Sequence, residues 1–372
     1  MDIIPKQNKN EEKFLRLSAI NPIYETNIID STETEIRGRE YVAWGKNNDF
    51  GEYLASLYND CPTLQSIING ATDYSCGDDI KINIEPYNSK INDKGETVNQ
   101  VVRNAFLDYW TYGAFALNIV RNKLGGIAGV YYINVRNIRS DKKNTYFWYS
   151  EDWSKSYGRV KSVKLPAFDP NKKDGSSILY VKRTYNGVYG VPVYGAALKA
   201  AEMEKSIDTY HLNAINNNFT GSYVLSFNDG VPTPEAQEKI TSDIEERFTG
   251  YQNAARILVA FNRTKDNAIT VEKLDTEDYG EHYKTLADRC QQALFTSFRM
   301  NANLAGIPTA QGFNSEEYAS AFKLYNKTQI LPAQRLMCDS FAKIFGEECL
   351  EIQPFSINFT EEENYSEQES IE

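Results

Sequence analysis

The sequence predicts an α+β fold built around two long helices with a small α/β module between them. Apolar residues recur at helical spacing over residues 195–219 and again over residues 275–300. Residues 220–274, which join these two segments, have the pattern strand, helix, strand. Residues 41–194 instead combine shorter helices with aromatic-rich strands. We therefore expect a mixed first half, a pair of long helices and an inserted module.

Three shorter helices are expected in the first half. One extends from about Phe50 to Tyr58, and Pro62 favours the start of a second, which stops near Gly77. The strand IKINI follows it, and a third helix ends at Gly113. The apolar side of the third helix consists of Val98, Val101, Val102, Ala105, Phe106 and Tyr109.

Strand-like segments separated by turn signals fill the rest of this half. They are AFALNIV, GVYYINV, TYFWYS, VKSVKLPAF and ILYVKRTY. Together they predict one antiparallel sheet. Residues 1–40, which are polar and show little periodicity, predict an arm that is loose unless a partner orders it.

Each long helix has one apolar stripe. The stripe of the first helix is Ala196, Ala200, Met203, Ile207, Tyr210 and Ala214. The stripe of the second helix is Tyr283, Leu286, Cys290, Leu294 and Phe298.

The inserted module contains two strand-like runs, SYVLSFN and ILVAFN, on either side of a helix. Thr233 suits the N-cap of this helix, Pro234 its first turn and Gly250 its C-cap, and ITVEKLD predicts one further strand. A module of about 55 residues buries too little surface to be stable alone. With no disulfide or metal to help it, we expect it to be stabilised by assembly. The expected assembly residues are Ile240, Ile244, Phe248 and Arg256.

Composition narrows the function classes. The chain has 372 residues and a formal net charge of −11, which argues against tight wrapping of nucleic acid or binding to an anionic membrane. The five cysteines are scattered and form no CxxC pair, so neither a zinc site nor a disulfide framework is indicated. The polar N-terminus and the absence of a long apolar run predict a soluble, intracellularly made protein without a membrane span.

Catalytic motifs are missing. No GxxxxGK[ST] or G-x-S-x-G stretch occurs, and the glycines of LGGIAG join two strands, so they predict a turn. His211 and His282 are the only histidines, and each lies on a long helix. We expect both to have ordinary surface or interface roles. We therefore predict neither an enzyme nor a cofactor, although scattered carboxylates leave an enzyme as an alternative.

A loop at residues 308–317, PTAQGFNSEE, has Gln311 and Gly312 at its tip. Asn314 or Ser315 suits the N-cap of the helix that follows. By its residues alone this is equally well an ordinary surface loop.

The order of these elements resembles the portal proteins of tailed double-stranded DNA bacteriophages. The resemblance covers most of residues 41–345. The segments that carry it include AWGKNNDFGEYLASLYNDCPTLQSIINGATDYSCGDDI, TYGAFALNIVRNKLGGIAGVYYINVRNIRSD, YGVPVYGAALKAAEMEKSIDTYHLNAINNNFTGSYVLSF, IEERFTGYQNAARILVAFN and FRMNANLAGIPTAQGFNSEEYASAFKLYNKTQILPAQRLM.

The resemblance implies a ring, typically of twelve subunits, at a capsid vertex, with an axial channel for the genome. It also implies a division of the chain into named parts. These are an arm (1–40), the wing (41–194), a stem helix (195–219), the clip (220–274), a second stem helix (275–300), the tunnel loop and its helix (301–326), the return of the wing (327–360) and an acidic tail (361–372). In this scheme the tunnel-loop residues that face DNA are Gln311, Gly312, Phe313, Asn314 and Ser315.

The implied partners are non-specific double-stranded DNA, the terminase large subunit, the major capsid or scaffold protein and a head-completion (adaptor) protein. The implied location is the virion, after assembly in the cytoplasm of a bacterial host. An unrelated α+β interaction protein or a cryptic enzyme, of phage or bacterial origin, is the alternative.

Overall fold

The computed structural model describes ten segments of the chain. They are residues 18–19, 31–153, 161–172, 175–184, 187–216, 223–227, 232–240, 257–261, 279–306 and 315–357. The chain divides into two compact units. The larger unit consists of Ile28–Lys205 and Asp288–Glu372, and the smaller consists of Met1–Asn27 and Ser206–Ala287.

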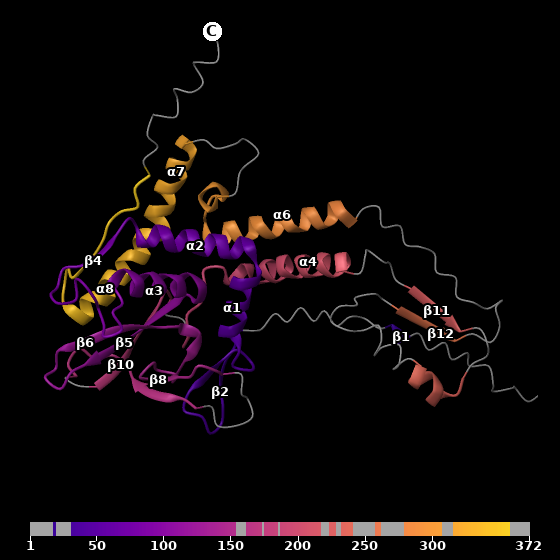
Figure 1. Cartoon of the computed structure of the whole chain (residues 1–372), viewed down its shortest axis with the longest axis horizontal. Helices are drawn as coiled ribbons and strands as arrows, with labels where there is room; N and C mark the ends of the chain where they lie inside the picture. The colour runs from indigo at the N-terminus through magenta and orange to yellow at the C-terminus, as the bar shows by residue number, and fades with distance from the viewer. Residues whose placement is uncertain are drawn as a thin grey trace, which may run out of the picture. The chain divides into compact units, whose positions relative to one another are not determined.

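The three expected helices open the larger unit (Figure 1). They are α1 (Phe50–Asp60), α2 (Pro62–Cys76) and α3 (Val98–Tyr112). Thr97 and Gln100 form a capping box at the start of α3. Gly113 ends the helix with φ of 72°, and a Cβ there would lie 2.1 Å from the Val191 carbonyl oxygen, so only glycine fits.

The strands form several small sheets instead of the single sheet that the sequence predicts. One sheet has the order β10-β5-β6, and another has the order β7-β8-β9. The first contains β5 (Ala114–Arg121), β6 (Ile127–Ile133) and β10 (Gly175–Lys182), and the second contains β7 (Ile138–Ser140), β8 (Tyr146–Tyr149) and β9 (Val163–Pro166).

A 3₁₀ turn, Val135–Asn137, explains why the sheet is divided. The turn follows β6, and the carboxylate of Asp108 accepts a hydrogen bond of 2.7 Å from the Val135 N–H. Asn134 caps the turn by accepting from the Arg136 N–H at 3.0 Å. The chain is therefore redirected after β6, and β7 pairs with β8 rather than continuing the first sheet.

Part of the expected arm belongs to the fold. Strand β2 (Glu33–Glu35) pairs with β3 (Val42–Trp44). Glu33 also accepts hydrogen bonds from the Val188 and Tyr189 N–H groups at 2.7 and 2.9 Å. Residues 33–35 are thus held by contacts that a polar sequence pattern does not reveal.

The C-terminal part returns to the first half. Strand β13 (Leu350–Ile352) pairs antiparallel with β4 (Ile80–Ile82). Before it, α7 (Ser315–Tyr325), a π-helical segment (Asn326–Ile330) and α8 (Leu331–Phe345) form one interrupted helix. Pro332 cannot donate a backbone hydrogen bond to the preceding turn, and the π-helical segment absorbs this break.

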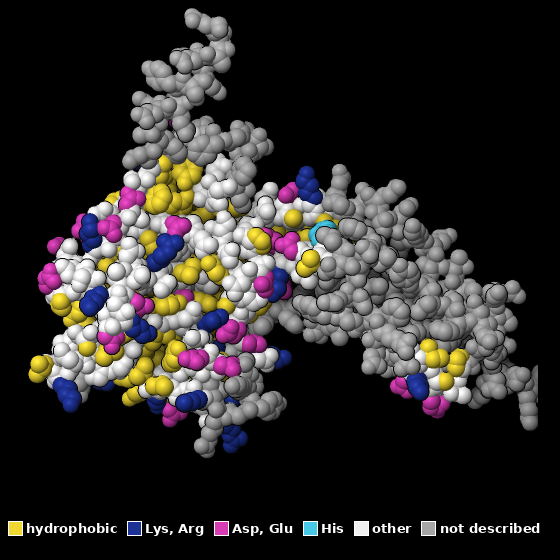
Figure 2. Space-filling view, viewed as in Figure 1, with side chains coloured by type: hydrophobic (Ala, Val, Ile, Leu, Met, Phe, Trp, Pro, Cys, Tyr) yellow, Lys and Arg dark blue, Asp and Glu magenta, His cyan; other side chains and the backbone are white. Residues whose placement is uncertain are grey.

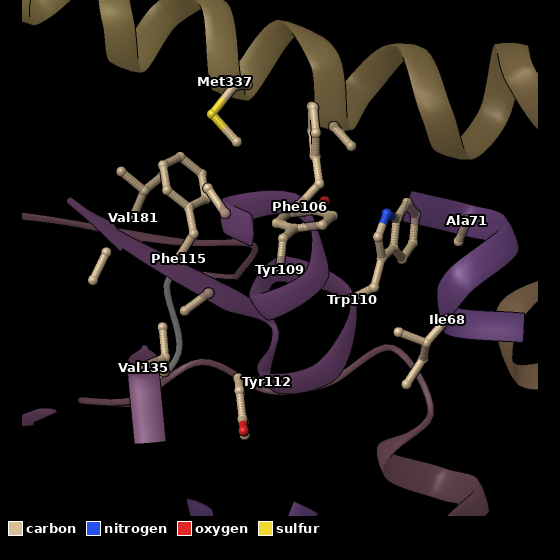
Figure 3. Packing of buried hydrophobic residues seen from close by; sticks show 14 of the residues in the cluster. Ile68, Ala71, Phe106, Tyr109, Trp110, Tyr112, Phe115, Val135, Val181 and Met337 are labelled. Carbon is tan, nitrogen blue, oxygen red and sulfur yellow. The ribbon is translucent and has the colours of Figure 1, made fainter. Parts of the chain in front are cut away.

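Helix α3 lies at the centre of the core (Figure 3). Phe106, Tyr109 and Trp110 extend from it toward α8, whose Met337 is fully buried. Every residue of its predicted apolar side is buried. Trp110 also donates from Nε1 to Ser75 Oγ at 3.0 Å, which ties α3 to α2.

The smaller unit contains the expected strand, helix and strand. Strands β11 (Tyr223–Phe227) and β12 (Ile257–Phe261) are parallel, and β1 (Ser18–Ala19) pairs with β12 on its other side. Residues 234–240 are helical, and Thr233 Oγ1 accepts from the Ala236 N–H at 3.4 Å. Gly250 and the expected strand ITVEKLD lie outside the described residues.

Asp108→Asn should remove a pH dependence of stability. Burial raises the pKa of Asp108 to about 8, against the opposing effect of the hydrogen bonds from Val135 and Tyr132. The folded protein then holds this proton more tightly than the unfolded chain does. The free energy of unfolding of the wild type should therefore fall as the pH rises from about 4 to about 8, by at most about 1.4 kcal/mol per pH unit from this group.

Urea unfolding across that pH range measures the effect, and D108N should show a shallower slope than the wild type. Asp339→Asn, which changes an exposed carboxylate on α8, is the control. If D108N and D339N had the same slope, the assignment to Asp108 would be wrong.

Candidate functional site at the base of the long helices

Both predicted long helices are present. Helix α4 (Leu198–Asn216) follows a 3₁₀ turn at Gly195–Ala197, and α6 (Tyr279–Phe298) returns after the inserted module. Along α6, the predicted stripe residues Cys290, Leu294 and Phe298 are buried, as expected.

An aromatic stack fixes the base of the two helices. Tyr194, just before α4, stacks on Phe298, the last residue of α6, with ring centroids 5.4 Å apart and an interplanar angle of 16°. Both side chains are fully buried. The Tyr194 hydroxyl donates to the Thr111 carbonyl at 2.8 Å. The start of α4 and the end of α6 are therefore held together at α3, so the helices run antiparallel in the larger unit.

The buried face of α4 differs from the predicted stripe. Ala200 is buried as expected, but Ala196 and Met203 are exposed. The other residues that bury this face are Ala197, Ala201 and Glu204. A hydrophobicity pattern assigns a glutamate to the solvent side, so it does not place Glu204 on this face, and the stem role of Met203 stays a prediction.

Glu204 is buried because it caps another helix. Its Oε1 accepts a hydrogen bond of 3.2 Å from the backbone N–H of Thr63, in the first turn of α2. Cys61, the N-cap residue of α2, provides no side-chain cap of its own. A carboxylate at this position accepts from a first-turn N–H group that has no partner within the helix, and it complements the positive end of the helix dipole.

Lys205, the residue after Glu204, binds helix α1, which precedes α2 in the sequence. Its Nζ lies 2.8 Å from Asp60 Oδ2 at the end of α1 and 2.8 Å from Ser56 Oγ. The contact with Lys205 lowers the pKa of Asp60 below its usual value. Glu204 thus binds the start of α2 and Lys205 the end of α1, and we call these three contacts the joint.

A second aromatic group lies further along the helices, in the smaller unit. Tyr210 stacks on Tyr283 with centroids 5.1 Å apart, and His211 meets Tyr283 edge-on at 5.0 Å. Within the described residues, no His, Cys, Asp and Glu side chains gather so that they could hold a metal ion. None of the described helices combines the length and hydrophobicity of a membrane span.

The predicted site residues occupy different environments. Tyr210 is exposed, Ile207, Ile240 and Leu286 are half-buried, and Ser315 is the first residue of α7. The others, apart from the stripe residues above, lie outside the described residues, namely Ile244, Phe248, Arg256, Gln311, Gly312, Phe313 and Asn314. The roles of all these residues remain predictions. The joint was missed, since an adjacent acid and base on a helix give no signal that distinguishes them from surface residues.

Comparisons with known proteins give a family and a fold. A sequence profile described as phage portal protein matches residues 74–367. No curated protein sequence matches the chain. A chain from the neck of a native GTA particle, computed with C12 symmetry, is 14% identical with a TM-score of 0.51, over 81% of this chain and 83% of that one. A chain from the virion of a native gene transfer agent (GTA) particle is 14% identical with a TM-score of 0.52, over the same shares. At this identity the structural likeness shows a shared fold.

Glu204→Ala should lower the free energy of unfolding by about 1–2 kcal/mol, because the Thr63 N–H loses its cap at a buried position. Thermal or urea unfolding followed by circular dichroism measures the loss. Met203→Ala changes the neighbouring, exposed residue and should alter stability by less than about 0.5 kcal/mol. Equal losses in the two variants would argue against the capping role.

Proposed function

Because the chain belongs to the phage portal protein family, we propose that copies of it form a ring at one vertex of a phage-like capsid, through which double-stranded DNA is packaged and ejected. The profile match over residues 74–367 carries this proposal, since it includes both long helices and the inserted module. Portal proteins are structural and not enzymatic, so the alternative of a cryptic enzyme falls away.

The two units of the chain differ in a way that supports separate roles in the ring. The larger unit has an extensive core of its own, whereas the described part of the smaller unit consists of short strands, helical residues 234–240 and parts of α4 and α6. We assign α4 and α6 to the stem and the β11–helix–β12 element to the clip, where neighbouring copies would complete each other's buried surface. Twelve copies is the number that the family resemblance implies, and C12 symmetry describes the GTA neck that shares this fold.

DNA would pass through the channel without strong attachment. The net charge of −11 opposes phosphate, so contacts with the duplex would be few, non-specific and weakened by salt. Residues 310–314 are the proposed contact, with Gln311 and Asn314 as neutral hydrogen-bonding groups. Terminase, a head-completion protein and the capsid or scaffold protein are the proposed protein partners.

Electron microscopy of the purified chain tests the ring. We expect closed rings with an axial hole, and in a density map residues 310–314 should line that hole. A preparation that contains only monomers of 42.4 kDa, at concentrations where the protein is folded, would contradict the proposal. A map with residues 310–314 on the outer rim would contradict their contact with DNA.

Phe248→Asp or Ile244→Asp should abolish most rings while leaving the larger unit folded, because burying an unpaired charge in an interface costs several kcal/mol. Micrographs give the ring fraction, and circular dichroism reports folding. Lys239→Asp is the control, since it places the same acidic side chain at an exposed position of residues 234–240 and makes a larger change in net charge. If both kinds of variant formed rings equally well, the clip would not be the assembly element.

A further inference from the structure

One exposed side of α7 and α8 is both apolar and basic. Leu324 is 66% exposed and Leu331 is 36% exposed, although both are large apolar side chains. Lys327, Thr328 and Arg335 are also exposed. These five residues recur at helical spacing, and we call them the ridge. Hydrophobic side chains reach the surface over α7 (Figure 2).

The ridge carries positive charge that the described part of the chain does not neutralise. Lys327 and Arg335 make no ion pair with any described carboxylate, and neither does Lys323 beside them. Along the described residues of α7 and α8, the exposed acidic residues are Glu316, Glu317 and Asp339, and all three lie beyond the two ends of the ridge. Two solvent-exposed leucines between unpaired cations, in a chain of net charge −11, predict a covering segment that is acidic and partly apolar.

The C-terminal segment has this composition. Residues 358–372 contain six glutamates and neither lysine nor arginine. Three apolar or aromatic residues, Phe359, Tyr365 and Ile371, are spaced evenly among the acidic ones. The acidic side chains of this segment therefore complement the basic residues of the ridge, and its apolar side chains complement the exposed leucines.

The chain leads to this segment from a fixed point beside α7. The Phe355 ring lies 5.7 Å from the ring of Phe322 in α7 and 5.0 Å from that of Tyr74. Ser356 donates from both its N–H and its hydroxyl to the carboxylate of Asp78. The segment thus starts next to the helix that bears the ridge.

The length is sufficient for the segment to reach the ridge. Phe322 is on the buried side of α7, so the chain has to pass around the helix. Fifteen extended residues span roughly 50 Å, whereas a helix with its side chains is about 10–12 Å across.

We infer that residues 358–372 bind the ridge of their own chain, with glutamates at Lys327 and Arg335 and apolar residues at Leu324 and Leu331. Bound there, the segment shields a basic surface that would otherwise attract polyanions without specificity. This contact goes beyond the proposed function.

Carbodiimide cross-linking of the full-length chain tests the inference, because the reagent joins a lysine amine directly to a carboxylate. We expect a cross-link from Lys327 to a glutamate of residues 361–369 that weakens severalfold in molar salt. Mixing isotope-labelled and unlabelled protein distinguishes a link within one chain from a link between copies.

Charge reversal provides the controls. The double variant K327E/R335E should lose the contact, and adding E361K/E363K/E367K should restore cross-linking between the reversed partners. Lys343→Glu, which reverses an exposed charge on the same helix away from the ridge, should have no effect on the Lys327 cross-link.

Three results would overturn the inference. Links found only between labelled and unlabelled copies would assign the ridge to a second copy of the chain. Charge reversal without loss of the tail cross-links would place the segment elsewhere. A ridge that cross-links to no glutamate of the segment, but whose reversal abolishes binding of added duplex DNA, would be a nucleic-acid surface instead.

Discussion

The long helices depend on one small set of polar contacts, in which Glu204 caps α2 and Lys205 pairs with the end of α1. The side chains of the ion pair are 30% (Lys205) and 47% (Asp60) exposed, so the pair alone contributes little to stability. The buried hydrogen bond from the Thr63 N–H to Glu204 contributes more to stability, since the N-cap residue Cys61 provides no side-chain cap for α2. Because α1 and α2 pack on α3, and the Tyr194–Phe298 stack also lies against α3, the core of the larger unit positions the first residues of α4.

The AWGKNND segment contributes buried side chains to the core. Trp44 stacks on Tyr189 with ring centroids 4.9 Å apart, and the Arg139 guanidinium lies between the rings of Trp44 and Trp153. Arg139 is fully buried, and it donates to the Asn48 side chain and to backbone carbonyls, among them that of Asn48 at 2.7 Å. Hence Trp44 and Asn48 of this segment belong to the buried core of the larger unit.

Sequence reasoning succeeded where a periodic pattern decides the structure. The helices that start at Phe50, Pro62 and Val98 were predictable from apolar spacing and from proline and glycine signals, as were the strands of the inserted module. It failed where a distant polar partner decides. Asp108 binds the Val135 N–H and redirects the chain after β6, so the strands form two sheets where one was expected. Glu204 binds the Thr63 N–H, so the buried face of α4 includes a glutamate. The residues that flank Asp108 and Glu204 in the sequence do not indicate that these side chains bind Val135 and Thr63.

Hydrogen–deuterium exchange on the wild type and on Glu204→Ala tests most directly whether the joint holds the base of the long helices. We expect faster exchange in the first turn of α2 and in residues 198–205 and 288–298, with unchanged exchange in the β10-β5-β6 sheet. Faster exchange that is confined to the first turn of α2, with α4 and α6 protected as in the wild type, would contradict this role of the joint.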